Sequence, residues 1–169
     1  RQKKGWYDNT CVSFIADNGA EGNDVVGRVA GKPGTMGYMH AANSFAEHGH
    51  NSIGRKGTFA EYGPAWAQVG MTPFRLWKGF LTEGGTRSPL IVSGPGVQGN
   101  GEINKEAVLH VKDIAPTILE MAGVRHPSNF KGREIDPMQG KSWVEMLAGK
   151  NQSPRSAKDR LGGELFGNR

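Results

Sequence analysis

Cysteine is almost absent from this sequence, since Cys11 is the only one among 169 residues. A single cysteine excludes an intrachain disulfide framework and any zinc finger built on cysteine pairs. Long apolar runs are absent too. No stretch approaches the ~20 apolar residues that a membrane-crossing helix needs, so no membrane span is predicted.

Glycine and basic residues are present in excess. The 26 glycines are about twice the usual share of about 7%, which predicts that much of the chain is loop. Lys and Arg number 21 against 16 Asp and Glu, a formal net charge of +5. This balance favours anionic ligands without identifying their kind. Because the basic residues are scattered and match no known module, nucleic acid is not predicted as a partner.

The apolar pattern predicts an α/β fold. Residues 10–16 and 88–93 are short apolar segments typical of strands covered on both faces, and residues 106–111 are predicted as a third strand. Since strands alternate with helices, we expect a mostly parallel sheet flanked by helices. Long glycine-rich loops, above all residues 17–58, separate the elements. Three strands are few for such a sheet, so we expect part of a larger α/β domain.

Two helices have clear end signals. A helix is predicted over residues 113–121, because an aspartate can cap its start and Gly123 follows its end. Ser142 and Glu145 are spaced as a capping box for a second helix. Residues 150–160 are polar and are interpreted as a linker.

Three further patterns resemble functional motifs, but the residues around them do not support those functions. "GPGVQG", residues 94–99, matches a dinucleotide-binding fingerprint in its letters, but no helix start follows, so we interpret it as a glycine turn. "QGKS", residues 139–142, lacks the first glycine of a phosphate-binding loop. His48 and His50, with His40 nearby, could suggest a transition metal, but their spacing alone favours loop residues in water.

Asp17, Asn18 and Gly19 directly follow the first predicted strand. These residue types are typical of a turn, which is the simpler interpretation. The alternative is part of a metal site, because ligands gather beyond the carboxyl ends of parallel strands. Both side chains offer oxygen, the donor that Ca²⁺ or Mg²⁺ prefers. Two residues cannot complete such a site, so the remaining ligands must come from elsewhere.

Several motifs together resemble the C-terminal part of the catalytic domain of a bacterial-type arylsulfatase, in the sulfatase family. The resemblance covers nearly the whole chain, and residues 73–89 are its most specific piece. It implies hydrolysis of small-molecule sulfate esters by an alkaline-phosphatase-like α/β fold. The motifs, in chain order, are "SFIADNGAEG", "NSIGRKGTFAEYGPAWAQVGMTPFRLWKGFLTEGGTRSPLIVSGPGV", "VKDIAPTILEMAGVRHP" and "ELFGNR".

The resemblance also implies roles for three residues. Asp17 and Asn18 occupy the positions of the family's ligands for calcium (or magnesium). Lys78 occupies the position of the lysine that contacts the substrate sulfate, a catalytic and substrate-binding role. An ammonium group suits this task as a compact point charge for a sulfuryl oxygen. The glycines at positions 79, 84 and 85 would let the backbone approach closely.

One departure from the family is decisive for activity. The family's nucleophile is a formylglycine made from the cysteine of a C-x-P-x-R motif, whereas Cys11 is followed by Val-Ser-Phe. We therefore predict that Cys11 is a buried core thiol. The family's upstream metal ligands also have no counterpart. Residues 1–169 are thus expected to be the C-terminal portion of a sulfatase catalytic domain, truncated at both ends. Their partner would be the remaining N-terminal part of the same enzyme, and they would be inactive alone.

Two other functions stay open at this point. A phosphatase or phosphodiesterase of the same superfamily would use similar metal-assisted chemistry on another anion. A non-catalytic module would bind an anion or a partner without turnover.

Overall fold

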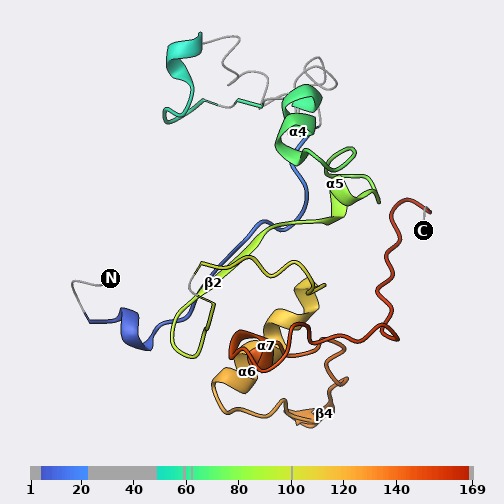
Figure 1. The fold of residues 1–169 in the computed structure, drawn as a ribbon. Helices are drawn as coiled ribbons and strands as arrows, with labels where there is room; N and C mark the ends of the chain where they lie inside the picture. Colours follow the sequence, from blue (N-terminus) through green and yellow to red (C-terminus); the bar gives the residue numbers. More distant parts are fainter. Residues whose placement is uncertain (1–4, 23–48, 59, 62, 100, 168–169) are drawn as a thin grey trace. The chain divides into compact units, whose positions relative to one another are not determined.

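The computed structural model describes residues 5–22, 49–58, 60–61, 63–99 and 101–167 (Figure 1). The chain divides into two compact units. Unit 1 comprises Arg1–Ile15 and Leu90–Gly162, and unit 2 comprises Ala16–Pro89 and Gly163–Arg169. Within the described ranges, no helix is long and apolar enough to cross a membrane.

Unit 1 contains two small sheets, and both are antiparallel. β1 (Val12–Ile15) pairs with β2 (Leu90–Ser93), and β3 (Asn129–Phe130) pairs with β4 (Arg133–Glu134) as a short hairpin. The first two predicted strands are therefore present but shorter than predicted, and the fold is a mixed α/β one. The β1–β2 register places Val12 opposite Ser93, Ser13 opposite Val92, Phe14 opposite Ile91 and Ile15 opposite Leu90.

The predicted parallel sheet is wrong for the described residues, which contain only antiparallel pairs. The connectivity explains the direction: β1 leads the chain into residues 16–89 and β2 leads it out again. Two adjacent segments that enter and leave the same unit run in opposite directions. Residues 106–111, predicted as a third strand, are irregular and end in the 3₁₀ turn η4 (Val111–Asp113).

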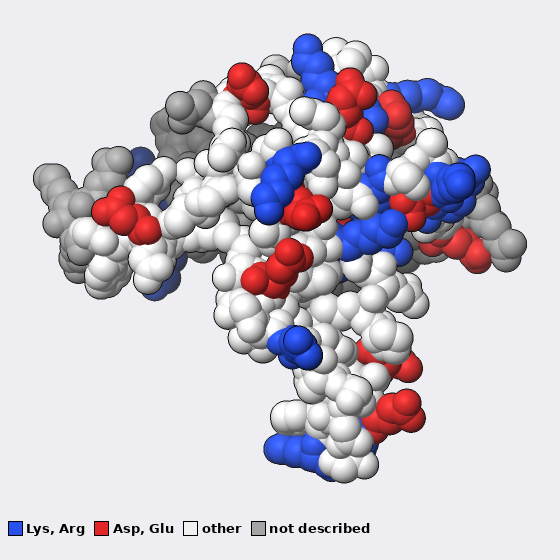
Figure 2. All heavy atoms as spheres, turned by 60° about the horizontal axis from the view of Figure 1, so that its bottom comes forward, with Lys and Arg blue, Asp and Glu red and all other residues white. Residues whose placement is uncertain are grey.

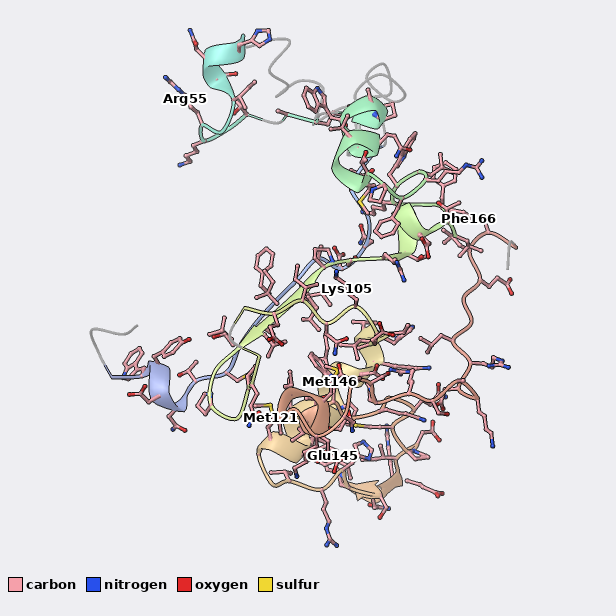
Figure 3. All side chains as sticks on the ribbon, in the orientation of Figure 1. Arg55, Lys105, Met121, Glu145, Met146 and Phe166 are labelled. Carbon is pink, nitrogen blue, oxygen red and sulfur yellow. The ribbon has the colours of Figure 1, made fainter. Side chains whose placement is uncertain are left out.

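The helices of unit 1 lie where the sequence predicts them, but their ends differ from the prediction. α6 (Ile114–Met121) follows η4, and Gly123 takes a positive φ of 66° just beyond it, as its predicted role requires. α7 (Val144–Leu147) packs against α6. Figure 3 shows the two helices side by side, with Met121 on one and Met146 on the other.

The predicted capping box of α7 is wrong. Trp143, one residue later than predicted, is the N-cap. The Ser142 hydroxyl does accept a hydrogen bond from the N–H of Val144, at 3.3 Å. Glu145, however, accepts from the side chain of Asn151 at 3.3 Å instead of reaching back to the helix start. The reciprocal pair that defines the box is therefore incomplete.

Asp113 lies at the centre of the packing in unit 1. Its side chain is fully buried, as is most of Trp143, and the Trp143 indole N–H donates to the Asp113 carbonyl oxygen at 2.9 Å. The Asp113 carboxylate accepts from the backbone N–H groups of His110, at 2.7 Å, and Lys141, at 2.8 Å. Asp113 does start α6, but its side chain does not cap the first turn of that helix. It closes a capping box around η4 with His110 and also bonds Lys141, farther along the chain.

Residues 150–160 are not a free linker, because Arg155 anchors them to the core. Its guanidinium donates two hydrogen bonds to the Asp113 carboxylate, and the one from Nη2 is 2.6 Å long. The Arg155 side chain is only 8% exposed. Burial alone would raise the pKa of Asp113, but the hydrogen bonds from Arg155, Lys141 and His110 outweigh it and lower that pKa. The composition of the segment, rich in Ser, Lys and Arg, concealed this buried pair.

Unit 2 contains two helices that the sequence analysis missed, α4 (Gly63–Met71) and α5 (Glu83–Thr86). A signal for α4 exists, because Pro64 in its first turn is a favoured starting residue. The short turns η2 (Tyr7–Asn9) in unit 1 and η3 (His50–Ser52) in unit 2 complete the described elements.

Candidate functional site

The Asp-Asn-Gly sequence forms a bend at the start of unit 2, after the end of β1. Asp17 is exposed, Asn18 is half-buried and Gly19 is buried. The Gly19 N–H donates to the carbonyl oxygen of Gly85 at 3.2 Å, which fixes the bend against α5. Both oxygen-bearing side chains are thus held on a short, anchored segment.

Three glycines let the backbone segments around this bend approach one another closely. A Cβ on Gly19 would lie 1.9 Å from the Gly84 oxygen, and one on Gly84 would lie 1.9 Å from the Leu76 oxygen. A Cβ on Gly85 would lie 2.0 Å from the Phe80 oxygen. No residue with a side chain fits at these positions without moving backbone. Gly84 and Gly85 therefore make the close approach expected of them.

Lys78 lies in a tight turn beside this bend. The Phe80 N–H donates to the Trp77 carbonyl at 3.2 Å, and Gly79 provides the positive φ of 92° that the turn requires. Nothing lies near the missing Cβ of Gly79, so its role is conformational rather than one of close packing. The Lys78 N–H donates to the Ala20 carbonyl at 3.0 Å, which ties the turn to the Asp-Asn-Gly segment.

The Lys78 ammonium forms an ion pair with Glu21, with 3.0 Å between Nζ and Oε2. Both side chains are partly exposed, at 44% and 40%. The hydrogen bond to Glu21 and the charge of that carboxylate raise the pKa of Lys78, and the charge of Asp17 adds to the effect. The structure therefore brings Lys78 and Asp17 within electrostatic range of each other. Sequence reasoning missed Glu21, although it lies in the same "DNGAEG" motif.

The donor set at the bend fits a hard cation in kind. Asp17 and Asn18 together offer two carboxylate oxygens and one carboxamide oxygen, whereas calcium takes about six to eight. In the part of the chain that the structure describes, no three His, Cys, Asp or Glu side chains gather to hold a metal. These residues therefore suit a share of a calcium or magnesium site whose other ligands come from elsewhere. His40 and His48 lie outside the described residues, and His50 lies in η3.

Cys11 is exposed, so its prediction as a buried core thiol is wrong. Cys11 precedes the first residue of β1 instead of lying inside the strand. The strand itself is poorly covered within the described residues, as Phe14, at 65% exposure, shows. A small two-stranded sheet buries too little surface to enclose a flanking thiol.

The segments that resemble a dinucleotide-binding fingerprint and a phosphate-binding loop have structural roles. Within residues 94–99, the Val97 N–H donates to the Gly94 carbonyl at 3.2 Å, which is the predicted glycine turn. In residues 139–142, the Lys141 N–H binds the buried Asp113 carboxylate. Figure 2 shows basic and acidic side chains interspersed on the face that it draws.

Comparison with known proteins identifies the family of this chain. Residues 75–159 match the family model described as N-sulphoglucosamine sulphohydrolase, C-terminal. This match covers half of the chain, including Lys78. The chain therefore belongs to the sulfatase family, and the resemblance seen in the sequence is confirmed.

Three relatives have names that agree with this assignment. An uncharacterized sulfatase of Schizosaccharomyces pombe (strain 972 / ATCC 24843) is 38% identical over 98% of this chain and 28% of its own length. An arylsulfatase of Klebsiella aerogenes is 30% identical over 88% of this chain and 30% of its own length. An extracellular sulfatase SULF-1 homolog of Drosophila melanogaster is 44% identical over 36% of this chain and 5% of its own length. The chain thus spans less than a third of each of these relatives.

Proposed function

We propose that this chain is the C-terminal portion of the catalytic domain of an arylsulfatase-type sulfuric ester hydrolase, with an alkaline-phosphatase-like fold in the complete domain. The observation that carries the proposal is the arrangement of Lys78. A hydrogen bond to the Ala20 carbonyl holds it beside the Asp-Asn-Gly bend, within the electrostatic range of Asp17. One chain segment thus supplies cation ligands and the other supplies a positive charge for the substrate.

The chemistry of a sulfate ester explains why both are useful. As the ester bond breaks, negative charge develops on the leaving oxygen and is shared with the sulfuryl oxygens. When bound by Asp17 and Asn18 with further ligands, Ca²⁺ or Mg²⁺ would polarise a sulfuryl oxygen and orient the group. The Lys78 ammonium would donate to another sulfuryl oxygen, and such contacts are worth most where charge develops.

Glu21 has a supporting role in this proposal. Its carboxylate orients the Lys78 ammonium through the ion pair and raises a pKa that already keeps this side chain charged at neutral pH. An ammonium has three N–H donors, so pairing with one carboxylate oxygen is compatible with donation to a sulfate oxygen. The nucleophile is proposed to lie outside these residues, because Cys11 lacks the formylglycine context.

The test replaces Lys78 in the sulfatase that contains this chain. Lys78→Ala should lower kcat/KM for an aryl sulfate by roughly 10²–10³, the scale of losing one charge-stabilising contact. Lys78→Arg should retain only part of the normal kcat/KM, because the planar guanidinium of arginine does not replace the compact ammonium of lysine. Lys56→Ala, at an exposed turn lysine, is the matched control and should be neutral. A near-normal kcat/KM in Lys78→Ala would reject the assignment, and a preference for phosphate over sulfate monoesters would favour a phosphatase.

A further inference from the structure

A pocket in unit 2 begins at the residue directly after Lys78. Its volume is about 410 Å³, within the range of about 300–1,000 Å³ that small-molecule sites occupy. It combines the turn that carries Lys78, the start of α5 and the segment near the end of the chain. Its lining residues are Gly79, Phe80, Leu81, Thr82 and Leu165.

The lining offers an apolar wall with one polar side chain, and that side chain is already engaged. The Thr82 hydroxyl donates to the Arg75 carbonyl at 2.6 Å. The Phe80 ring packs edge-to-face on Trp77, with 5.5 Å between centroids and 85° between planes, and this contact orients the aromatic wall. Figure 3 shows Phe166, the neighbour of Leu165, beside α5. The pocket is therefore suited to an apolar group that needs few hydrogen bonds.

The position of the pocket identifies the kind of group. Lys78 and Gly79 are the two central residues of one turn, so the proposed sulfate contact and the first lining residue are adjacent in the chain. In a sulfate ester, a single bridging oxygen separates the anionic head from the organic group. Lys78 itself is not a lining residue and its ammonium lies at Glu21, so the ester would lie between that ammonium and the pocket that begins at Gly79.

Building on the proposed function, we propose that this pocket is the subsite for the organic group of the ester. The group that fits is aromatic or aliphatic, not a sugar. A sugar ring carries several hydroxyl groups, and burying them without partners costs free energy. The only polar side chain in the lining is that of Thr82, whose hydroxyl already donates to the Arg75 carbonyl and can therefore only accept from a sugar hydroxyl. Leu81 and Leu165 are the specificity-determining residues.

The experiment measures binding to the 169-residue chain by ligand-observed NMR, with three probes: 2-naphthyl sulfate, 2-naphthol and glucose 6-sulfate. 2-Naphthol should bind to the chain, and glucose 6-sulfate should not compete with it. Leu165→Asn and Leu81→Asn should each weaken the binding of 2-naphthol and 2-naphthyl sulfate roughly tenfold or more, the scale of altered apolar contacts in a pocket. Ile103→Asn, at an 81% exposed apolar residue of unit 1, is the matched control and should leave the binding of both naphthyl probes unchanged. Circular dichroism verifies that each variant keeps its fold, and having two pocket variants protects the test if one unfolds.

The Lys78→Ala variant separates this inference from the proposed function. This substitution should weaken the binding of 2-naphthyl sulfate and leave the binding of 2-naphthol unchanged. If Lys78→Ala acts in this way but both pocket variants bind the two naphthyl probes normally, the subsite is overturned and the sulfate contact stands. If the pocket variants lose naphthol binding but Lys78→Ala binds 2-naphthyl sulfate normally, the subsite stands and the proposed function fails. Absence of naphthol binding to the unmodified chain, or equal binding of the sugar sulfate, also overturns the subsite.

Discussion

The candidate site shows that the role of a residue depends on its neighbours more than on its type. The chain has many lysines, and most lysines in proteins are simply solvated. Lys78 is instead held at two points, its N–H by Ala20 and its ammonium by Glu21. In unit 1, Lys141 is held in a similar way by Asp113 and Asp159, so among the described lysines only Lys78 combines such anchoring with a place beside the Asp-Asn-Gly bend. Asp17 likewise differs from an ordinary turn residue because Gly19 is anchored behind it. Backbone contacts therefore place both charged groups before any ligand arrives.

At this scale we predict that Asp17→Ala removes tight calcium binding from the sulfatase that contains the chain. Losing a carboxylate ligand should lower kcat/KM for an aryl sulfate by about 10² or more, since metal polarisation is worth several kcal/mol. The measurements are metal content after dialysis and steady-state kinetics. Asp136→Ala, at an exposed acid in unit 1, serves as the control. Unchanged metal content and rate in Asp17→Ala would show that the bend is only a turn.

At the scale of secondary-structure elements, close backbone contact determines the geometry of the site. α5 has a buried glycine pair at its centre, and these glycines bring the helix against the turn at residues 75–80 and against Gly19. A four-residue helix has little stability of its own. Its position depends on these contacts and on the Gly84 N–H, which donates to the Arg75 carbonyl at 3.2 Å.

We predict that Gly84→Ala destabilises unit 2 by about 1–3 kcal/mol or more, the cost of overpacking. Its Cβ would lie 1.9 Å from the Leu76 oxygen and 2.5 Å from the Arg75 oxygen, and both are backbone atoms that move only with the chain. Urea unfolding followed by tryptophan fluorescence measures the loss. Gly162→Ala, where a Cβ meets nothing within 4 Å, should be nearly neutral. Equal midpoints for the two variants would refute the packing argument.

The Asp113–Arg155 pair links α6 to the segment after α7, and it makes stability depend on pH. Because the folded-state pKa of Asp113 is lowered, its contribution is complete above the ordinary aspartate pKa of about 3.9 and is lost as the pH falls through the folded value. Asp159 acts in the same direction, since a hydrogen bond from Lys141 lowers its pKa to about 2.

We predict that Asp113→Asn costs about 3–5 kcal/mol near neutral pH, because Arg155 keeps a buried charge without its counter-ion. We expect the unmodified chain to become less stable below about pH 4, and the stability of the variant should depend much less on pH in that range. Thermal unfolding midpoints across the acid range test both statements. Asp136→Asn, at an exposed residue, should retain the normal profile. A neutral-pH midpoint unchanged by Asp113→Asn would contradict the role of the pair.

At the scale of the whole molecule, the proposed function needs more than the described residues supply. In that proposal Asp17 and Asn18 are the oxygen donors and Lys78 is the cation, and Cys11, the only cysteine of the sequence, lacks the formylglycine motif. Apolar surface is also uncovered, since Phe14 and Ile91 face each other across β1 and β2 and are 65% and 62% exposed.

We predict that residues 1–169, expressed alone, do not hydrolyse sulfate esters. Removing a covalent nucleophile leaves little more than binding and electrostatics. The assay is a chromogenic aryl sulfate with added calcium, beside a blank purified in parallel from cells without the gene. Calcium-dependent turnover that survives repurification would mean that the chain contains another nucleophile.

The sequence alone determined the features that depend on a few neighbouring residues. The β1 and β2 segments, the helix that ends before Gly123 and the Asp-Asn-Gly bend all follow from apolar patterns and turn residues. The motifs, including the one around Lys78, also identified the family. Such signals are local, and a single sequence contains them directly.

Only the tertiary structure decided which distant residues meet. It paired β1 with β2 in the antiparallel direction, brought Arg155 to Asp113 across 42 residues and placed Glu21 against Lys78. It also left Cys11 exposed. These outcomes depend on long-range packing and on the burial of charge. A carboxylate in the sequence can pair with any of the 21 Lys and Arg residues, and the free energy of the whole fold selects one.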